Sequence, residues 1–153
     1  MEENEQMTDS KDKKILEALL SNSRISYRSL AKKTGLSTAT VIKHLGKLEQ
    51  DKVIKGFTTR IDYEKIGYDV MALVEVRIAH GKLFDVEGKI AKSPNVIGLF
   101  DVTGDFDALI LARFKNRRGL DFFIKKIQTY EFVERTSTRL VLNVIKQEDT
   151  PLF

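Results

Sequence analysis

Residues 26–48 read SYRSLAKKTGLSTATVIKHLGKL, and this stretch decides the fold of the N-terminal third of the chain. Its apolar residues recur at helical spacing on both sides of Thr34-Gly35-Leu36. Glycine readily adopts the left-handed conformation that ends a helix, and Ser37 is of a residue type that caps the start of the next helix. A short helix, a tight turn with glycine and a longer helix form the pattern of a helix-turn-helix unit. The residues expected to face inward are Leu30, Ala31, Val41, Leu45 and Leu48.

Another helix is predicted just upstream of this pair. Asp9 or Ser10 can cap its start, and polar residues end it near positions 21–23. Its apolar face at helical spacing consists of Ile15, Leu16, Leu19 and Leu20.

Residues 53–61, downstream of the third helix, alternate in character around Gly56 and predict a small β wing. We therefore expect a winged helix-turn-helix domain over residues 1–60, with the acidic, polar residues 1–8 disordered.

Positive charge is concentrated in this part of the chain. Residues 22–60 hold nine Lys and Arg against two Asp and Glu, a net charge of 9 − 2 = +7, whereas the whole chain of 153 residues has +4. Residues 68–153 hold 13 basic and 12 acidic residues, a net charge of +1. A concentrated positive field suits a polyanion, because neutralised phosphates release their condensed counterions. The alternative is a solvated surface of Lys and Arg with no partner.

The solvent side of the third helix has residue types that fit a DNA groove. Threonine can contact bases or phosphates, and lysine pairs with phosphates or guanine edges. His44 has two interpretations, a peripheral DNA contact or a plain surface residue; no His, Cys or carboxylate lies three or four residues away to share a metal. The predicted DNA-binding residues are Arg28, Ser37, Thr38, Thr40, Lys43, His44, Lys47, Lys55 and Arg60. The alternative for this unit is a three-helix bundle that binds protein.

The periodicity changes after residues 61–67, which we expect to be a linker. The predicted strands cover residues 68–79, 96–102, 108–114 and 138–145, and the predicted helices cover 82–93 and 119–130. The order β-α-β-β-α-β predicts a ferredoxin-like domain over residues 68–153, and hence an α+β fold for the chain. A sheet covered by helices on one face only needs a partner for the other face, which predicts a homodimer.

Composition excludes several classes of function. The chain has no cysteine and two histidines, so we expect no disulfide, no metal site and no cofactor. Its longest apolar stretch, residues 70–76, is broken by Glu75 and is too short to span a bilayer, and the acidic N-terminus does not resemble a signal peptide. These features predict a cytoplasmic protein at the nucleoid, with no membrane partner. An RNA-recognition domain is disfavoured, because Lys55-Gly56-Phe57 begins the expected motif but Thr58 and Thr59 depart from it.

Short stretches in a fixed order carry a family resemblance across residues 9–146. They are DKKIL (12–16), RISY (24–27), LAK (30–32), GLS (35–37), VIKGF (53–57), TGDFD (103–107) and VERTST (133–138). In order and spacing they resemble the Lrp/AsnC (feast/famine) transcription regulators. The resemblance implies a winged helix-turn-helix joined to a ferredoxin-like effector domain, which assembles dimers into tetramers or octamers.

The resemblance also implies a small-molecule effector, usually an amino acid, bound between dimers near a Gly-Asp turn and a Thr-x-Thr strand. Carried over by position, the effector-binding candidates are Gly104, Asp105, Asp107, Thr136 and Thr138. Aspartate can accept from an ammonium group, whereas loop N–H groups and threonine hydroxyls can donate to a carboxylate. The alternative is an ordinary hairpin turn and threonines chosen for β propensity. Phe106 stands where the family often has Tyr, which leaves the ligand more open.

The expected function is sequence-specific binding of double-stranded DNA. A dimer would place its third helices in successive major grooves, one helical turn apart, on a near-palindromic site. Two rivals remain at this point: an enzyme like the haem-biosynthesis decarboxylases that resemble this family, and a ligand-sensing assembly protein without a DNA role. The intact basic stretch and the scarcity of histidine favour a regulator that is not an enzyme.

Overall fold

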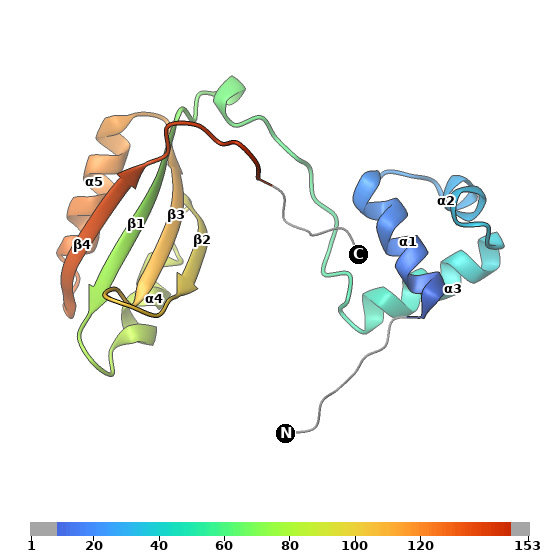
Figure 1. The fold of residues 1–153 in the computed structure, drawn as a ribbon, viewed down its shortest axis with the longest axis horizontal. Helices are drawn as coiled ribbons and strands as arrows, with labels where there is room; N and C mark the ends of the chain where they lie inside the picture. The colour runs from blue at the N-terminus through green and yellow to red at the C-terminus, as the bar shows by residue number, and fades with distance from the viewer. Residues whose placement is uncertain (1–8, 148–153) are drawn as a thin grey trace. The chain divides into compact units, whose positions relative to one another are not determined.

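The computed structural model describes residues 9–147 of the chain. Two compact units follow one another, the first extending to Arg60 and the second spanning Ile61–Gln147 (Figure 1). The disorder predicted for residues 1–8 lies outside the described residues, as do residues 148–153 of the predicted second domain. The first unit consists of α1 (Ser10–Ser21), α2 (Tyr27–Thr34) and α3 (Thr38–Gln50).

Side-chain caps fix where the three helices start. The Asp9 carboxylate accepts from the Lys11 N–H (3.3 Å), Ser26 Oγ from the Ser29 N–H (3.2 Å), and Ser37 Oγ from the Thr40 N–H (3.1 Å). These bonds satisfy N–H groups that have no partner inside a helix. The α2–α3 turn has the predicted glycine, since Gly35 has φ +70° in the left-handed region.

The core of this unit confirms the inward faces predicted for α2 and α3. The buried apolar residues are Ile15, Ala18, Leu30, Ala31, Val41, Leu45 and Leu48. The face predicted for α1 is partly wrong, because Leu20 is 42% exposed and Asp12 is buried in its place. Apolar spacing alone did not identify a carboxylate as part of the inner face.

The β wing predicted over residues 53–61 is wrong as a strand. In the described part of the chain the first strand begins only at Val70. The Ile54 N–H donates instead to the Leu48 carbonyl (3.0 Å), closing the end of α3. An extended segment needs a neighbouring strand for its backbone groups, and an alternating sequence pattern does not supply one.

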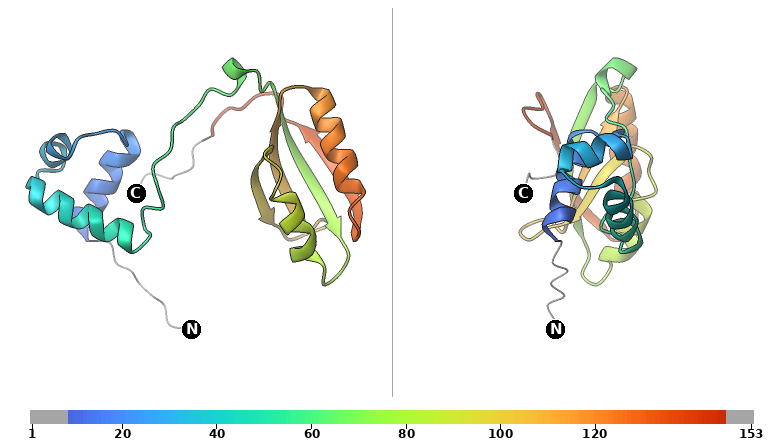
Figure 2. Two further views of the ribbon diagram at one scale, coloured as in Figure 1. Left: turned by 180° about the vertical axis from the view of Figure 1, so that it is seen from behind. Right: turned by 90° about the vertical axis from the view of Figure 1, so that its right-hand side faces the viewer.

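The second unit confirms the predicted β-α-β-β-α-β order. After a 3-10 turn at Glu64–Ile66 it consists of β1 (Val70–Ile78), α4 (Leu83–Ile90), β2 (Val96–Asp101), β3 (Ala108–Phe114), α5 (Arg117–Gln128) and β4 (Val133–Leu140). The strands form one antiparallel sheet in the order β2-β3-β1-β4, and α4 and α5 lie on the same face of it (Figures 1 and 2). The helix α5 begins two residues earlier than predicted, because Asn116 Oδ1 accepts from the Gly119 N–H (3.0 Å) and caps it.

Alternation along the strands separates a buried face from an open face. Ala72, Val74 and Val76 of β1 are fully buried beneath the helices. Residues between them point to the other side of the sheet, because successive side chains of a strand alternate. We call this second side the open face; it includes Met71, Leu73, Glu75, Arg77, Leu109 and Leu111.

The last strand lies earlier than predicted, at Val133–Leu140 instead of residues 138–145. Thr136 and Thr138 pair with Val76 and Val74, so registration with β1 decides which segment joins the sheet. The apolar residues that suggested a strand lie beyond it, and Leu142 and Ile145 are 89% and 93% exposed. Hydrophobicity favoured the wrong segment because an edge strand needs a pairing partner more than it needs burial.

Candidate functional site

The helix α3 presents two lysines on one exposed side. Lys43 and Lys47 lie one turn apart, and both side chains are exposed. Neither forms an ion pair with any residue that the structure describes. The first turn of α3 contains no acidic residue. The helix therefore carries two cations whose charge is available to an external anion.

The first turn of α3 brings Ser37 and Thr40 together. Their hydroxyl oxygens are 2.8 Å apart, and Ser37 Oγ also caps the helix, so part of its bonding capacity is already used. Thr38, beside them, is exposed. The remaining predicted cations are exposed too: Arg28 on α2, with Lys55 and Arg60 after α3.

His44 lies differently from its predicted position on the solvent side. Its Nδ1 is 2.7 Å from Asp12 Oδ1 of α1, and its side chain is only 19% exposed. The other Asp12 oxygen accepts from the Asp9 N–H (3.2 Å), which completes the capping box of α1. His44 thus ties α3 to α1 through one ring nitrogen, and Asp12 is a residue that sequence reasoning missed. The two partners are 32 positions apart in the sequence, which hides the pairing from any local pattern.

We expect Asp12→Ala to destabilise the helix-turn-helix unit by about 1.5–3 kcal/mol, because it removes a buried charge-assisted hydrogen bond and half of a capping box. Hydrogen exchange of the α1 and α3 backbone amides in the full chain checks this, since local opening should become easier. Asp9→Ala, which removes only the exposed cap, is the control and should have the smaller effect. Exchange rates in Asp12→Ala equal to those of the wild type would contradict the role of this contact.

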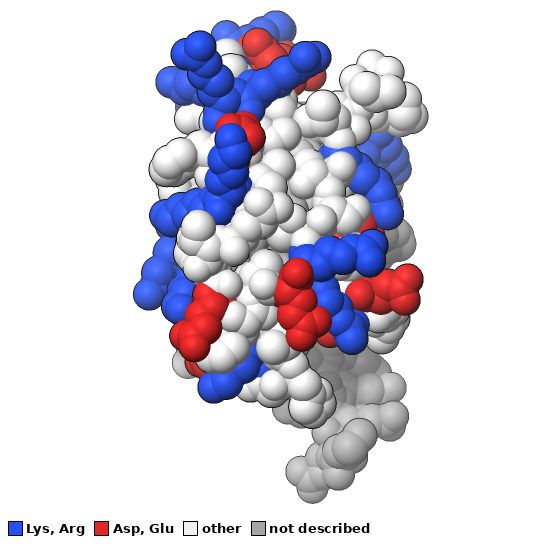
Figure 3. Space-filling view, turned by 90° about the vertical axis from the view of Figure 1, so that its left-hand side faces the viewer, with Lys and Arg blue, Asp and Glu red and all other residues white. Residues whose placement is uncertain are grey.

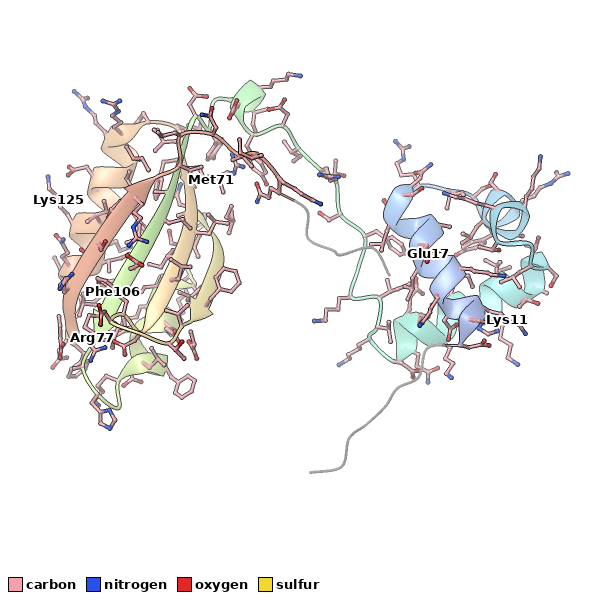
Figure 4. The ribbon with its side chains drawn as sticks, viewed as in Figure 1. Lys11, Glu17, Met71, Arg77, Phe106 and Lys125 are labelled. Carbon is pink, nitrogen blue, oxygen red and sulfur yellow. The ribbon has the colours of Figure 1, made fainter. Side chains whose placement is uncertain are left out.

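In the second unit, the turn between β2 and β3 is held by β1. Gly104 has φ +120°, a conformation that side chains rarely adopt. Arg77 Nη1 donates to the Asp105 carbonyl (3.3 Å), and Figure 4 labels both Arg77 and Phe106 at this end of the sheet. The Asp107 carboxylate accepts from the Ile78 N–H (2.8 Å), where the pairing of β1 with β4 shifts register. Asp107 is therefore already occupied in bridging two strands, whereas Asp105 is exposed.

Two arginines at this turn were not singled out by the sequence analysis. Arg77 lies 3.5 Å from Asp107 Oδ1, with Glu134 4.0 Å from its Nε. The Arg135 guanidinium lies 5.0 Å from the centre of the Phe106 ring, within the range of a cation–π contact. The turn is thus lined by side chains of both charge signs, arginines and carboxylates.

The two predicted threonines lie on the other face of the sheet. Thr136 and Thr138 pair directly with the buried Val76 and Val74, so their side chains point toward the helices. Thr136 Oγ1 accepts from Gln128 Nε2 of α5 (2.9 Å). A single chain consequently does not bring these threonines and the Arg77 side of the turn into one site.

A carboxyl pair lies next to the same turn. Burial first, and then the neighbouring Asp101 carboxyl, raise the pKa of Glu87 from 4.5 to about 7. Glu87 Oε1 is buried and accepts no hydrogen bond of standard geometry from the described residues. Glu87 is on α4 and Asp101 ends β2, so the pair joins the helix layer to the strand that leads into the turn.

The second unit should lose stability as the pH rises from 4.5 through about 7. The folded chain holds the Glu87 proton more tightly than the unfolded chain, so the stabilisation is complete below the lower pKa and is lost above the higher one. Thermal unfolding across this range checks the slope, and Glu87→Gln should flatten it. Asp85→Asn, an exposed carboxyl on the same helix, is the control and should keep the slope of the wild type. The same pH dependence in Glu87→Gln would contradict this assignment.

The described residues contain no group of three or more His, Cys, Asp or Glu side chains that could hold a metal ion. They also contain no helix both long and apolar enough to cross a membrane.

The fold and its cationic α3 define a helix-turn-helix transcriptional regulator with a separate α+β domain, and comparisons with known proteins agree. Residues 8–55 match the family described as winged helix-turn-helix DNA-binding, and residues 71–151 match the Lrp/AsnC ligand binding domain. An uncharacterized HTH-type transcriptional regulator of Pyrococcus abyssi is 40% identical over 142 residues, which cover 93% of this chain and 97% of that protein. The chain belongs to the Lrp/AsnC family.

Solved structures of this family have the same fold. Escherichia coli AsnC superposes with a TM-score of 0.86 at 27% identity, covering 94% of this chain and 98% of that one. A transcriptional regulator from Neisseria meningitidis, solved as a complex with L-Met, has a TM-score of 0.89 at 26% identity, covering 95% and 97% of the two chains.

Proposed function

We propose that the protein is a sequence-specific regulator that binds near-palindromic double-stranded DNA as a homodimer at the nucleoid. Residues 1–60 bind the DNA, and residues 68–153 assemble the chains and sense a ligand. Residues 61–67 are the linker between these two domains. The observation that carries this proposal is the pair of exposed, unpaired lysines on α3, Lys43 and Lys47, behind a first turn of hydroxyl side chains. Lysines neutralise phosphates, and the hydroxyls of Ser37, Thr38 and Thr40 fix the register or contact bases.

The open face of the sheet supports dimerisation. Leu73 pairs with Leu111 at its centre, and on the adjacent strand β2 the ring of Phe100, 53% exposed, lies over Gly98. Exposed apolar surface of this kind marks an interaction site in soluble proteins. A second copy of the same face, related by two-fold symmetry, would cover it.

We infer that the effector is an amino acid bound where dimers meet to form a tetramer or octamer. The Neisseria meningitidis relative in complex with L-Met supports this class of ligand. The arrangement in one chain supports a shared site, since Arg77, which holds the Asp105 carbonyl, and the threonines of β4 point to opposite faces of the sheet. Asp105, exposed at the turn, would accept from the ligand ammonium, whereas Asp107 would hold the turn in place. A ligand can change the assembly only through different affinities for its two states.

Selection of bound duplexes from a random pool tests the proposal, using the full chain with and without a mixture of amino acids and with native mass measured in parallel. We expect enrichment of two inverted half-sites one helical turn apart. We also expect added amino acids to change either the native mass of the protein or the length of the selected DNA site. Failure to enrich any sequence would contradict specific DNA binding. Enrichment that amino acids leave unchanged, at constant mass, would contradict the effector.

A further inference from the structure

The near-neutral second unit carries a strongly basic helix. Residues 115–128 contain five Lys and Arg and one acidic residue, Asp121, a net charge of 5 − 1 = +4. The exposed cations are Lys115, Arg117, Arg118, Lys125 and Lys126. Figure 3 shows Lys and Arg side chains gathered along the side of the unit on which α5 lies. The charges of residues 68–153 therefore sum to almost zero without being evenly spread.

Folding does not account for the cations at the start of α5, whereas Lys125 and Lys126 lie in its last turn, where the helix dipole favours positive charge. Arg117 and Arg118 occupy the first turn of α5, where the helix dipole disfavours positive charge, and no acidic residue in that turn offsets them. Lys125 pairs with Asp121 (2.7 Å), but Arg117, Arg118 and Lys126 pair with no carboxylate among residues 9–147. Charges that oppose the helix and lack internal partners fit an external anion.

The helix layer is also the side that a dimer leaves uncovered. If two copies meet through their open faces, α5 of each copy points outward, because it packs on the opposite face of the sheet. Arg118 and Lys125 are seven residues apart and share the outward side of α5, with Phe122, 71% exposed, between them. Seven residues of helix span about 10 Å, close to the width of a DNA groove, about 12 Å for the major groove.

We propose that this α5 surface (Arg117, Arg118, Phe122, Lys125 and Lys126) is a second contact for duplex DNA, which binds the phosphate backbone of DNA extending beyond the site held by α3. The inference rests on the proposed function, because the duplex bound by α3 supplies a high local concentration of DNA. Contacts between lysine or arginine and phosphate need no particular sequence, so any flanking DNA would serve. The α5 surface thus lengthens the bound DNA without reading bases.

Binding of the full chain to two random-sequence duplexes tests this proposal. One duplex is just long enough for two half-sites, about two helical turns, and the other is several times longer. Arg118→Ala/Lys126→Ala should lower the salt slope on the long duplex by about one unit for each phosphate that the variant no longer neutralises, and should leave the slope on the short duplex unchanged. The charge-conserving Arg118→Lys/Lys126→Arg should keep the slope of the wild type on both.

The control is Lys89→Ala/Lys92→Ala, which removes two exposed cations, one in the last turn of α4 and one just after this helix, and should change neither slope. The proposal is overturned if the α5 variant behaves like the wild type on the long duplex, if its slope falls equally on both duplexes, or if the slope of the control falls as much. The α5 surface would instead bind a second copy of the chain if Phe122→Ala changed the native mass while Arg118→Ala/Lys126→Ala left the salt slopes unaltered. That result would also overturn the proposal. Failure of the proposed function gives a different result from failure of the α5 proposal. If α3 does not bind DNA, Lys43→Ala/Lys47→Ala leaves binding to the short duplex intact.

Discussion

Lys43→Ala/Lys47→Ala should weaken binding to every DNA sequence by about a hundredfold or more, since each charge-assisted hydrogen bond contributes about 1.5 kcal/mol or more. Both lysines are exposed on α3 and form no ion pair within the described chain, so their charge is not engaged elsewhere. The slope of log affinity against log salt should fall by about one unit for each lysine–phosphate pair that the substitutions remove. Titration of a labelled duplex at several salt concentrations measures both quantities.

Lys13→Ala/Lys14→Ala provides a matched control. These two substitutions on α1 remove the same charge from the same unit, at exposed positions, without touching α3. If only net charge matters, both double variants will lose affinity equally, and the placement of α3 in the groove will be wrong. Unchanged affinity and slope in the α3 variant would contradict DNA binding through this helix.

Local chemistry explains why the N-terminal unit was largely predictable. Caps, a left-handed glycine and apolar periodicity act within a few residues, and Ser37, Gly35 and Val41 all have the structural roles that their types suggest. The β-α-β-β-α-β order was readable for a similar reason, because alternating burial in β1 and β3 follows from one covered face.

Long-range contacts explain what the sequence could not reveal. The His44–Asp12 pair joins residues that are distant in the chain, and β4 is fixed by its register with β1. The supposed wing fails because alternation carries no information about a pairing partner. Each of these features depends on where another element lies, which a single sequence does not specify.

The candidate effector turn shows the same limit at the level of single residues. Asp105 and Asp107 are equivalent in sequence reasoning, yet only Asp107 receives the Ile78 N–H, and Arg77 was absent from the prediction. Testing effector contacts by mutation therefore needs Asp105 first, because changing Asp107 would also release the turn.

The open face supports the second large expected effect. Leu111 of β3 lies opposite Leu73 of β1 and Gly98 of β2, at the centre of the sheet. A carboxylate there would be buried against the partner in a dimer formed through this face. Desolvating an unpaired charge costs several kcal/mol per ion, and each dimer would contain two.

We therefore expect Leu111→Asp to convert the proposed dimer into monomers, measured by native mass, and to weaken operator binding by about a thousandfold or more, because two linked half-sites become independent. Leu140→Asp is the matched control: it makes the same chemical change on β4, but Leu140 pairs with the buried Ala72 and so faces the helix side. It should leave the mass and the DNA affinity unchanged. A dimeric Leu111→Asp chain would contradict assembly through the open face. It would also remove the reason for placing the α5 surface on the outside of the dimer, so the native mass of this variant bears on both proposals.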